Sequence, residues 1–509
     1  MCPTCGKNPR RAPGQRCHSC FLEWQRNRRK ARAAGAPKKH LVPAESERVF
    51  DRDLKKKVLF ITSAQNATPV HQAFLNTLQI AAKHRGGEVV VIPLRYKNPT
   101  SIWSDKQDSD DWWAPEVVPF LCNQRKELNK NLVLVGDIKI QPTATSPLSG
   151  FEALTGAESC IIGHPRMQFR SVSVPSGRYP KILSTTGICT QPNFTDTKAG
   201  KLGDFHHFLG AVVVEIDGNT FHLRQIEAHR KTGEFTDRRW HYTVKGVQNA
   251  KPALGLVLGD SHARFNSKAV DVATFGKGGI VEELNPQTIV FHDVLDGYAV
   301  NPHHHGNPFI SQAKYRGKVG NVREEVEHAV GFIKKRVNGR KGVVVASNHD
   351  DFLSRWVISS DWKSNPVNAE FYLETALAML RSVKLTEKGS EHADPFVHWV
   401  EKLKGDANIR CLGPDESFEI ADIECSLHGH RGPNGARGSL KNLSRLGVKV
   451  ITAHAHTPGI EGGNYQVGTS TPLRLEYTGG ASSWLNSHAV VYASGARSII
   501  TVIDGKWRR

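Results

Sequence analysis

Five short polar clusters in the second half of the chain combine residue types that bind divalent metal ions. Carboxylate oxygens, imidazole nitrogens and an amide oxygen form a mixed donor set, which suits manganese, iron or zinc better than a thiolate-seeking metal. In order, the clusters are Asp260-Ser261-His262, Asp293 with Asp296, Asn348-His349-Asp350, His428 followed by Gly429 and His430, and His454-Ala455-His456. This set predicts a hydrolytic centre with two cations, of the kind that acts on phosphate esters.

Four of these clusters closely follow short apolar segments that are typical of buried strands. The segments cover residues 254–258, 288–291, 343–345 and 448–451, whereas the His428 cluster lies in a Gly-rich stretch. Side chains at the carboxyl ends of successive strands converge on one edge of a sheet, where open α/β folds bind their ligands. We therefore expect the clusters to meet at one sheet edge.

The order of the clusters resembles the calcineurin-like metallophosphoesterase family, whose motifs are Asp-x-His, Gly-Asp-x-x-Asp, Gly-Asn-His-Asp/Glu, His and Gly-His-x-His. The resemblance runs from about residue 255 to residue 459 and implies a layered αββα sandwich. It also implies two ligand sets that share Asp293: Asp260, His262, Asp293 and His456 for one cation, and Asp293, Asn348, His428 and His454 for the other. His430 is an alternative to His428, although the family usually places this ligand directly before a glycine.

The same resemblance implies a catalytic role for His349, which would contact the scissile phosphate and protonate the departing oxygen. Asp296 matches the acid that orients this histidine, and a carboxylate partner would favour the imidazolium that a general acid requires. The sequence departs from the family at His292, Ser347 and Ala453, where glycines are usual. Since none of the three is a ligand, these departures concern the local turns and not the donor set.

Two neighbouring stretches have both a functional and a structural interpretation. Residues 430–438 form a Gly-rich basic loop. The loop could bring Arg431 and Arg437 onto a substrate phosphate near the cations, or it could be a plain surface turn. His303, His304 and His305 could line the substrate cleft or form an exposed polar loop.

The amino-terminal segment has the cysteine spacing of a zinc module. Cys2 and Cys5 form one Cys-x2-Cys pair, and Cys17 and Cys20 form a second pair eleven residues later. Four thiolates make a closed tetrahedral zinc site. So short a segment has almost no core, and bound zinc would therefore supply most of its folding free energy.

Positive charge is concentrated in the same part of the chain. The 509 residues carry a formal charge of +19, and residues 1–40 hold eleven Lys or Arg and one Glu, a formal +10. Basic side chains that neutralise phosphates release counterions, so DNA is the expected partner, with a solvated basic tail as the alternative. No membrane span or signal-peptide core is visible, and we expect a cytoplasmic protein.

Hydrophobic periodicity and composition predict an α/β protein in four parts. We expect a four-cysteine zinc module at 1–25, a basic helix or linker at 26–48, an α/β accessory domain at 49–248 and the metallophosphoesterase catalytic domain at 249–509. In the accessory domain, strands are expected at 58–62, 89–92, 132–135 and 212–216, and a helix at 71–84. In the catalytic domain, helices are expected at 322–337 and 369–383.

The zinc module and the basic segment favour a DNA nuclease among the phosphoesterases, because fold and metal ligands alone do not select a substrate. Residues 57–75, 291–309 and 428–440 also resemble the pre-early DNA-transfer nucleases of tailed phages. That resemblance implies a phage-encoded protein that degrades host DNA in the host cytoplasm.

The expected reaction is attack on a DNA phosphodiester by a hydroxide that bridges two cations. Mn²⁺ is the first expectation for these cations, with Fe²⁺, Zn²⁺ or Mg²⁺ as alternatives. Two other functions stay open: a phosphatase or phosphodiesterase of small nucleotides, and a non-catalytic zinc-containing DNA-binding or scaffold protein. Homo-oligomers are also common at this chain length.

Overall fold

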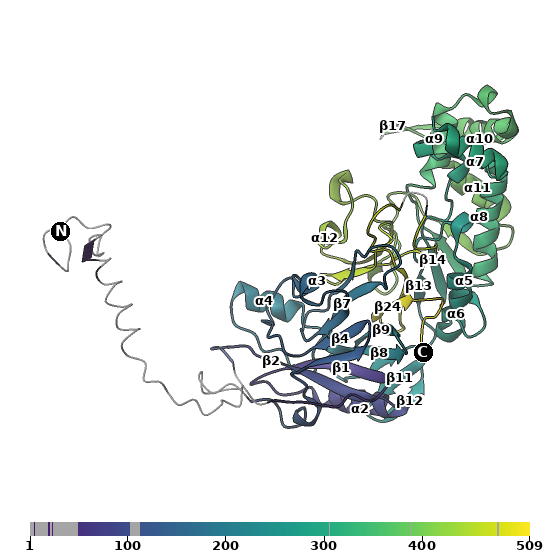
Figure 1. The fold of residues 1–509 in the computed structure, drawn as a ribbon. Coiled ribbons are helices and arrows are strands. Elements are labelled where there is room, and N and C mark those ends of the chain that lie inside the picture. The colour runs from purple at the N-terminus through teal and green to yellow at the C-terminus, as the bar shows by residue number, and fades with distance from the viewer. Residues whose placement is uncertain are drawn as a thin grey trace. The chain divides into compact units, whose positions relative to one another are not determined.

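The computed structural model describes residues 5, 19, 20, 23, 49–101, 112–304, 306–387, 389–475 and 478–509. The chain divides into two units, residues 1–48 and residues 49–509. The described strands assemble into sheets of four, three, six, two and nine strands, with helices against them (Figure 1). The chain is therefore a mixed α/β protein, as expected. Cys2, Cys17 and the predicted basic segment at 26–48 lie outside the described residues.

A six-stranded sheet carries three of the strands that precede the polar clusters. Its order is β18 (Ile409–Cys411), β15 (Lys341–Val344), β14 (Thr288–Phe291), β13 (Gly255–Val257), β23 (Asn486–Val491) and β24 (Arg497–Val502). β13, β14, β15 and β18 run parallel, whereas β23 and β24 run antiparallel to their neighbours. The carboxyl ends of the four parallel strands therefore lie along one edge.

Alternate side chains of these strands face two different cores. Leu256, Ile289 and Val344 belong to a core with α5 (Lys268–Phe275), α6 (Ile280–Leu284), α8 (Val322–Val337) and α11 (Pro395–Leu403). Their neighbours Val257, Val290 and Val343 point the other way, into a core that is shared with the nine-stranded sheet. Because side chains alternate along a strand, continuous apolar runs build a sheet that is covered on both faces.

The nine-stranded sheet joins the two parts of the chain that were expected to be separate domains. Its order is β19 (Ile423–Glu424), β20 (Lys449–Thr452), β22 (Asn464–Gln466), β21 (Gly459–Glu461), β6 (Phe169–Val172), β7 (Lys181–Thr185), β5 (Ser159–Ile162), β4 (Leu132–Val135) and β3 (Arg125–Asn129). β21 pairs with β6, so strands from both sides of the expected boundary at 248/249 complete one sheet. One hydrophobic core also contains residues from both parts, so packing is continuous across that boundary.

The expected accessory strands form a smaller sheet and part of the large one. β2 (Glu88–Leu94), β1 (Val58–Gln65), β8 (Gly210–Asp217) and β9 (Thr220–Glu227) lie in this order in the four-stranded sheet. α2 (Gln72–His84) connects β1 to β2 and begins after His71, whose side chain accepts a hydrogen bond from Phe74 N. β10 (Phe235–Asp237), β11 (Trp240–Thr243) and β12 (Gly246–Asn249) form a separate antiparallel meander.

Three further helices and a hairpin lie beyond the edge of the six-stranded sheet (Figure 1). They are α7 (Pro308–Arg316), α9 (Asp351–Ser359), α10 (Ala369–Ser382) and the hairpin of β16 (Lys384–Thr386) and β17 (Gly389–Glu391). In the part of the chain that the structure describes, no helix combines the length and the apolar character that a membrane crossing requires.

Candidate metal centre

The first two polar clusters are held side by side because their loops continue the pairing of the strands before them. Beyond β13 and β14, Ser261 N donates to His292 O, His262 N donates to Asp293 O, and Ala263 N donates to Val294 O. These backbone hydrogen bonds carry the parallel register past the end of the sheet. The Asp260-His262 and Asp293-Asp296 segments therefore enter the centre together.

The other donor groups come from the second sheet. His428 follows β19, and His454 and His456 follow β20, both in the nine-stranded sheet. The expectation of a single sheet edge is therefore wrong, because the centre lies where the edges of two packed sheets meet. The short strand before His428 was missed, since the two residues Ile423 and Glu424 are too few to show a period.

Four of the predicted ligands have an unusual backbone conformation. The φ angles are 36° at His262, 43° at Asp293, 72° at His454 and 56° at His456. Residues with a Cβ seldom adopt this left-handed region, and it concentrates where a side chain must be aimed at a site. The folded chain thus tolerates local strain at the residues that the sequence singles out.

Asp260, His456 and His262 bring their donor atoms together on one side of the centre. His456 Nε2 lies 3.1 Å from Asp260 Oδ2, and His262 Nε2 lies 3.2 Å from His456 Nε2. Donors that bind one ion at about 2.1 Å stand roughly 3.0–3.4 Å apart. The spacing therefore fits a shared cation.

Asp293, His428 and Asn348 form the second group. His428 Nε2 lies 3.1 Å from Asp293 Oδ2 and 3.1 Å from Asn348 Oδ1. The ring of His454 is 5.1 Å from the ring of His428, measured between centroids. Three overlapping sets of donor atoms, each within 4.8 Å, all contain Asp293: with His262 and His349, with His428 and His454, and with Asp260 and His456.

The lack of hydrogen-bond partners at the buried carboxylates also fits the binding of divalent cations. Among the described residues, both carboxylate oxygens of Asp260 and Oδ1 of Asp293 are buried without a hydrogen-bond partner. A buried charge with so few partners is costly unless a cation offsets it. Carboxylate, imidazole and amide donors match manganese, iron or zinc, so the residues present fit the metals that the sequence analysis expects.

The contacts of Asp296 differ from the sequence-based expectation. Nδ1 of His262 donates to Asp296 Oδ1 over 2.9 Å, whereas Nδ1 of His349 donates to the backbone oxygen of Asp296 over 2.8 Å. The carboxylate thus orients a predicted metal ligand, and the backbone orients His349. Both contacts place the proton on Nδ1 in the neutral rings, which leaves Nε2 of each histidine available toward the centre.

Charges within the centre shift the pKa values of its residues. Burial lowers the pKa of His262, but the hydrogen bond to Asp296 and the charge of Asp293 outweigh burial and raise this pKa to about 9. Burial raises the pKa of Asp293, but the nearby His428 and His349 hold it well below its ordinary value. For His349, burial dominates and its pKa is lowered. The partner of His349 Nδ1 is thus the backbone oxygen of Asp296 and not the carboxylate that was expected to favour its imidazolium.

The remaining predicted residues lie around this centre. Arg431 and Arg437 are exposed and face each other in a short antiparallel bridge of the Gly-rich loop. A Cβ on Gly438 would lie 1.8 Å from Gly429 O, so this loop is pressed against the residue that follows His428. His430 lies beside the rings of His428 and His454, at 5.4 Å and 6.0 Å between centroids, but outside the three converging donor sets.

The histidine-rich turn contacts the centre indirectly. His303 is exposed and its ring lies 6.2 Å from that of Phe352, which in turn lies 4.8 Å from the ring of His349. His304 contacts Tyr298, at 4.9 Å between ring centroids. His305 lies outside the described residues.

Three ring contacts at the centre were not expected from the sequence. Trp484 lies against His456 with 4.1 Å between ring centroids, and Phe352 lies against His349. His292, first noted only as a departure from a glycine, is buried and stacks on His428 at 5.6 Å. No motif marks Trp484, whereas the position of Phe352 just after the Asn348 cluster was a usable signal.

Comparison with known proteins gives a relative that matches most of the chain. No protein-family model matches the chain. A likeness to Vps29 of Chaetomium thermophilum covers 34% of this chain and 90% of that one, with 7% identity and a TM-score of 0.20, which is too low to bear on the fold. The chain is 32% identical to protein A1 of Escherichia phage T5 over 476 residues, 89% of this chain and 83% of that protein. It therefore belongs to the family of phage T5 protein A1.

Proposed function

We propose that this chain is a nuclease that uses two divalent cations to hydrolyse DNA phosphodiesters. The observation that supports this proposal is the position of Asp293, whose carboxylate takes part in three donor sets, each within 4.8 Å. A carboxylate in that position can bridge two cations and offset their mutual repulsion. Such a pair, Mn²⁺ in the first instance, would lower the pKa of a water molecule and polarise the phosphate.

The protein residues around that pair have separable roles. Asp260, His262, Asp293, Asn348, His428, His454 and His456 would hold the cations. Nε2 of His349 is the ring atom left available by the bond from Nδ1 to Asp296 O, so it can hold or move the proton of the departing oxygen. Arg431 and Arg437, on the exposed loop next to His428, would contact substrate phosphates.

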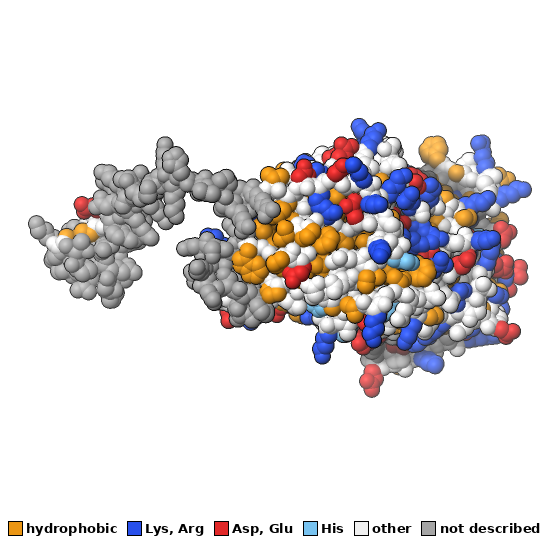
Figure 2. Space-filling view, turned by 90° about the horizontal axis from the view of Figure 1, so that it is seen from below, with side chains coloured by type: hydrophobic (Ala, Val, Ile, Leu, Met, Phe, Trp, Pro, Cys, Tyr) orange, Lys and Arg blue, Asp and Glu red, His pale blue; other side chains and the backbone are white. Residues whose placement is uncertain are grey.

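Charge supports a long polyanion as the substrate. Of the formal +19, residues 1–40 contribute about half. On the face shown in Figure 2, Lys and Arg side chains border a band of hydrophobic side chains, and acidic side chains lie among them. The excess charge is not gathered into one patch on that face. Because residues 1–40 hold about half of the formal charge, the amino-terminal segment is the main proposed DNA contact. A zinc ion held by Cys2, Cys5, Cys17 and Cys20 belongs to the same proposal, as does host DNA as the substrate during infection.

Cleavage of supercoiled plasmid by the full-length protein tests the proposal. With Mn²⁺ added after chelation, we expect nicked and linear products, and His349→Ala should slow cleavage by about 10²- to 10⁴-fold. His392→Ala, which removes an exposed histidine near α11, is the matched control. Equal rates for wild type and His349→Ala would contradict the assignment of His349. A lack of cleavage with every divalent metal would contradict the nuclease.

Salt dependence distinguishes DNA from a small nucleotide as the substrate. If the basic residues neutralise DNA phosphates, KM for plasmid should rise steeply with salt concentration. The reason is that the counterions released on binding contribute less favourable free energy when the solution already contains more salt. Turnover of a dinucleotide should change little over the same range. Efficient dinucleotide hydrolysis together with salt-independent plasmid cleavage would favour a small-nucleotide phosphodiesterase.

A further inference from the structure

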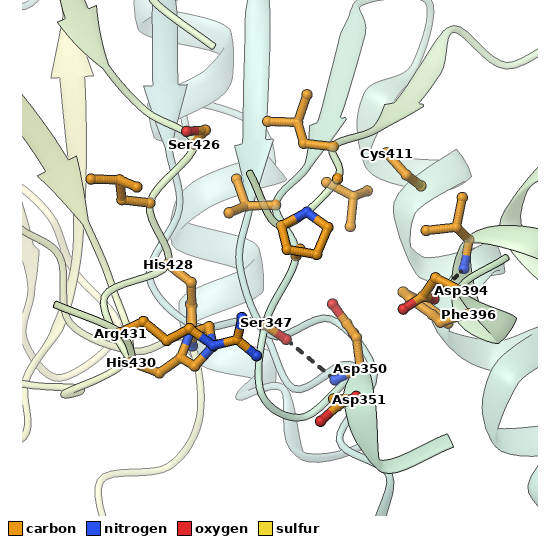
Figure 3. Close-up of a pocket in the computed structure, with 18 of the residues that line it drawn as sticks. Ser347, Asp350, Asp351, Asp394, Phe396, Cys411, Ser426, His428, His430 and Arg431 are labelled. Atoms are coloured by element: carbon orange, nitrogen blue, oxygen red, sulfur yellow. Dashed lines mark hydrogen bonds between the residues drawn. The ribbon is translucent and has the colours of Figure 1, made fainter. Parts of the chain in front are cut away.

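A cavity of about 140 Å³ opens beside the metal centre and shares His428 with it, and His430 also lines this cavity. Its walls come from the loop after β15, the amino-terminal ends of α9 and α11, the loop after β18 and residues 426–431. Figure 3 shows His428, His430 and Arg431 on one side of this pocket and Asp350, Asp351 and Asp394 on the other. A group bound here would be a direct neighbour of a phosphate at the centre.

Most of the lining is apolar, and one acceptor in it is unused. Val344, Leu412, Pro414 and Leu427 form part of the walls. Among the described residues, Oδ1 of Asp350 is buried without a hydrogen-bond partner. A buried acceptor of this kind is costly to leave unpaired, so it points to a ligand that donates a hydrogen bond.

The other two carboxylates of the pocket already have partners. Asp394 Oδ1 accepts from Val397 N over 2.9 Å at the start of α11, and Asp351 Oδ2 accepts from Arg355 over 2.8 Å. In the described part of the chain, Asp350, Asp351 and Asp394 do not form a set of donors within 4.8 Å, so a third cation is a poor fit. The pocket instead suits a flat, largely apolar ring that carries one N–H donor.

We propose that this pocket binds an amino-bearing nucleobase (cytosine, adenine or guanine) next to the scissile phosphate. The inference rests on the proposed nuclease function and adds base selection to it. The exocyclic amino group of such a base would donate to Asp350 Oδ1, while Arg431 at the metal side of the pocket contacts the backbone phosphate. Thymine has no exocyclic amino group that could donate to Asp350 Oδ1.

Single-stranded oligonucleotides of thymidine with one different nucleotide test this selection. Cleavage next to cytosine or adenine should be about 10- to 100-fold faster than next to thymine or an abasic site. Purine deoxynucleoside, which is adenine without its amino group, should behave as the abasic site does. Equal cleavage at all of these positions would overturn the pocket assignment while leaving the nuclease intact.

Two variants separate the pocket from the chemistry. Leu412→Trp should fill the cavity and reduce the ratio of the cleavage rates next to cytosine and next to thymine to about 1, while cleavage at an abasic position continues. Leu154→Trp, at an exposed leucine of α3 (Phe151–Leu154), is the matched control. Asp350→Asn adds a donor and should move the preference toward thymine. If both variants keep the wild-type preference, the base does not enter this pocket.

Nucleotide-binding measurements test the pocket without requiring cleavage. By calorimetry with the full-length protein, dCMP should bind at least about tenfold more tightly than TMP, and Leu412→Trp should abolish the difference. Equal affinities would overturn the pocket assignment. A selective affinity without any cleavage would instead support the pocket and contradict the nuclease.

A different feature, the outer surface of α10, supports a second inference. Phe371, Thr375 and Met379 face the core, but Leu373, Leu377 and Leu380 lie on another stripe and are 47%, 46% and 70% exposed. We call these three leucines the outer stripe. Large exposed apolar side chains at a spacing of four and three residues are typical of a helix that packs against a second helix.

The charges beside the outer stripe indicate the partner. Glu370 precedes the stripe, and Arg381 and Lys384 follow it, all of them exposed. In an antiparallel pair of α10 helices, the first turn of one copy, which carries Glu370, lies beside the last turn of the other, which carries Arg381. We infer that a second copy of this chain covers the outer stripe through a two-fold interface.

Mass measurement by light scattering at micromolar concentration tests the dimer. The wild type should have twice the chain mass of 56.3 kDa, and Leu377→Glu should have the mass of one chain. Glu370→Lys should weaken the dimer at least about tenfold, and adding Arg381→Glu should restore it by exchanging the two charges. A monomeric wild type, or an oligomer that Leu377→Glu leaves intact, would overturn the inference.

Discussion

Replacement of Asp296 by asparagine distinguishes two roles for this residue. In the structure its carboxylate accepts from Nδ1 of His262 over 2.9 Å, while only its backbone oxygen contacts His349. Asparagine keeps the size and the backbone contact but removes the negative charge. The variant therefore perturbs a predicted metal ligand and leaves the orientation of His349 unchanged.

The expected size of the effect follows from that contact. Loss of a carboxylate that orients a metal-binding histidine usually costs about 10- to 100-fold in metal affinity. This corresponds to about 1.4–2.7 kcal/mol, since each tenfold change in affinity is about 1.4 kcal/mol. Because the amide oxygen can still accept from His262, we expect the lower half of this range.

The assay is a Mn²⁺ titration with two readouts on the same protein. Calorimetry should show Mn²⁺ binding that is about tenfold weaker in Asp296→Asn, and the Mn²⁺ concentration for half-maximal plasmid cleavage should rise equally. The rate at saturating Mn²⁺ should stay within a few-fold of wild type. Asp361→Asn, at the exposed start of a short helix, controls for the loss of one charge.

The opposite pattern would refute this reasoning. If the carboxylate of Asp296 acted through His349, metal affinity would be unchanged and the rate at saturating Mn²⁺ would fall by about 10²-fold or more. Because Asp296 is buried, the melting temperature of the variant must also be measured. A large loss of stability would affect both readouts together and would also contradict a role confined to one ligand.

Three further outcomes follow from other parts of the chain. Elemental analysis should find one zinc per chain beyond the two exchangeable ions, and Cys5→Ser with Cys20→Ser should remove that zinc. Gly438→Ala should abolish cleavage and lower stability by about 1–3 kcal/mol, because its Cβ would lie 1.8 Å from a backbone oxygen; an active, stable variant would contradict the close approach. The pKa of Glu215 is lowered, because Arg224 and other arginines outweigh its burial. Its stabilisation is therefore present above about pH 4.3 and is lost as pH falls toward the folded-state pKa, so thermal melts should show wild type and Glu215→Gln converging in acid.

Local sequence patterns predicted the elements well. The helix expected at 322–337 is α8, the strand expected at 132–135 is β4, and the segments before three polar clusters are β13, β14 and β15. These predictions succeeded because apolar runs and helical spacing report burial, which is a local property of each segment. The sheet that crosses the expected boundary at 248/249 could not be predicted in this way, because pairing of β21 with β6 is a contact between distant residues.

The sequence alone determined the donor set of the candidate centre, since the residue types, their order and their places after strands are all local. Only the tertiary structure decided that two sheets supply these donors, that the Asp296 carboxylate contacts His262, and that His292 and Trp484 lie against the ligands. The physical reason is the range of the interactions. Side-chain chemistry and periodicity can be recognised from neighbouring residues in the sequence. Which side chains contact one another in a packed centre depends instead on how strands far apart in the chain come together.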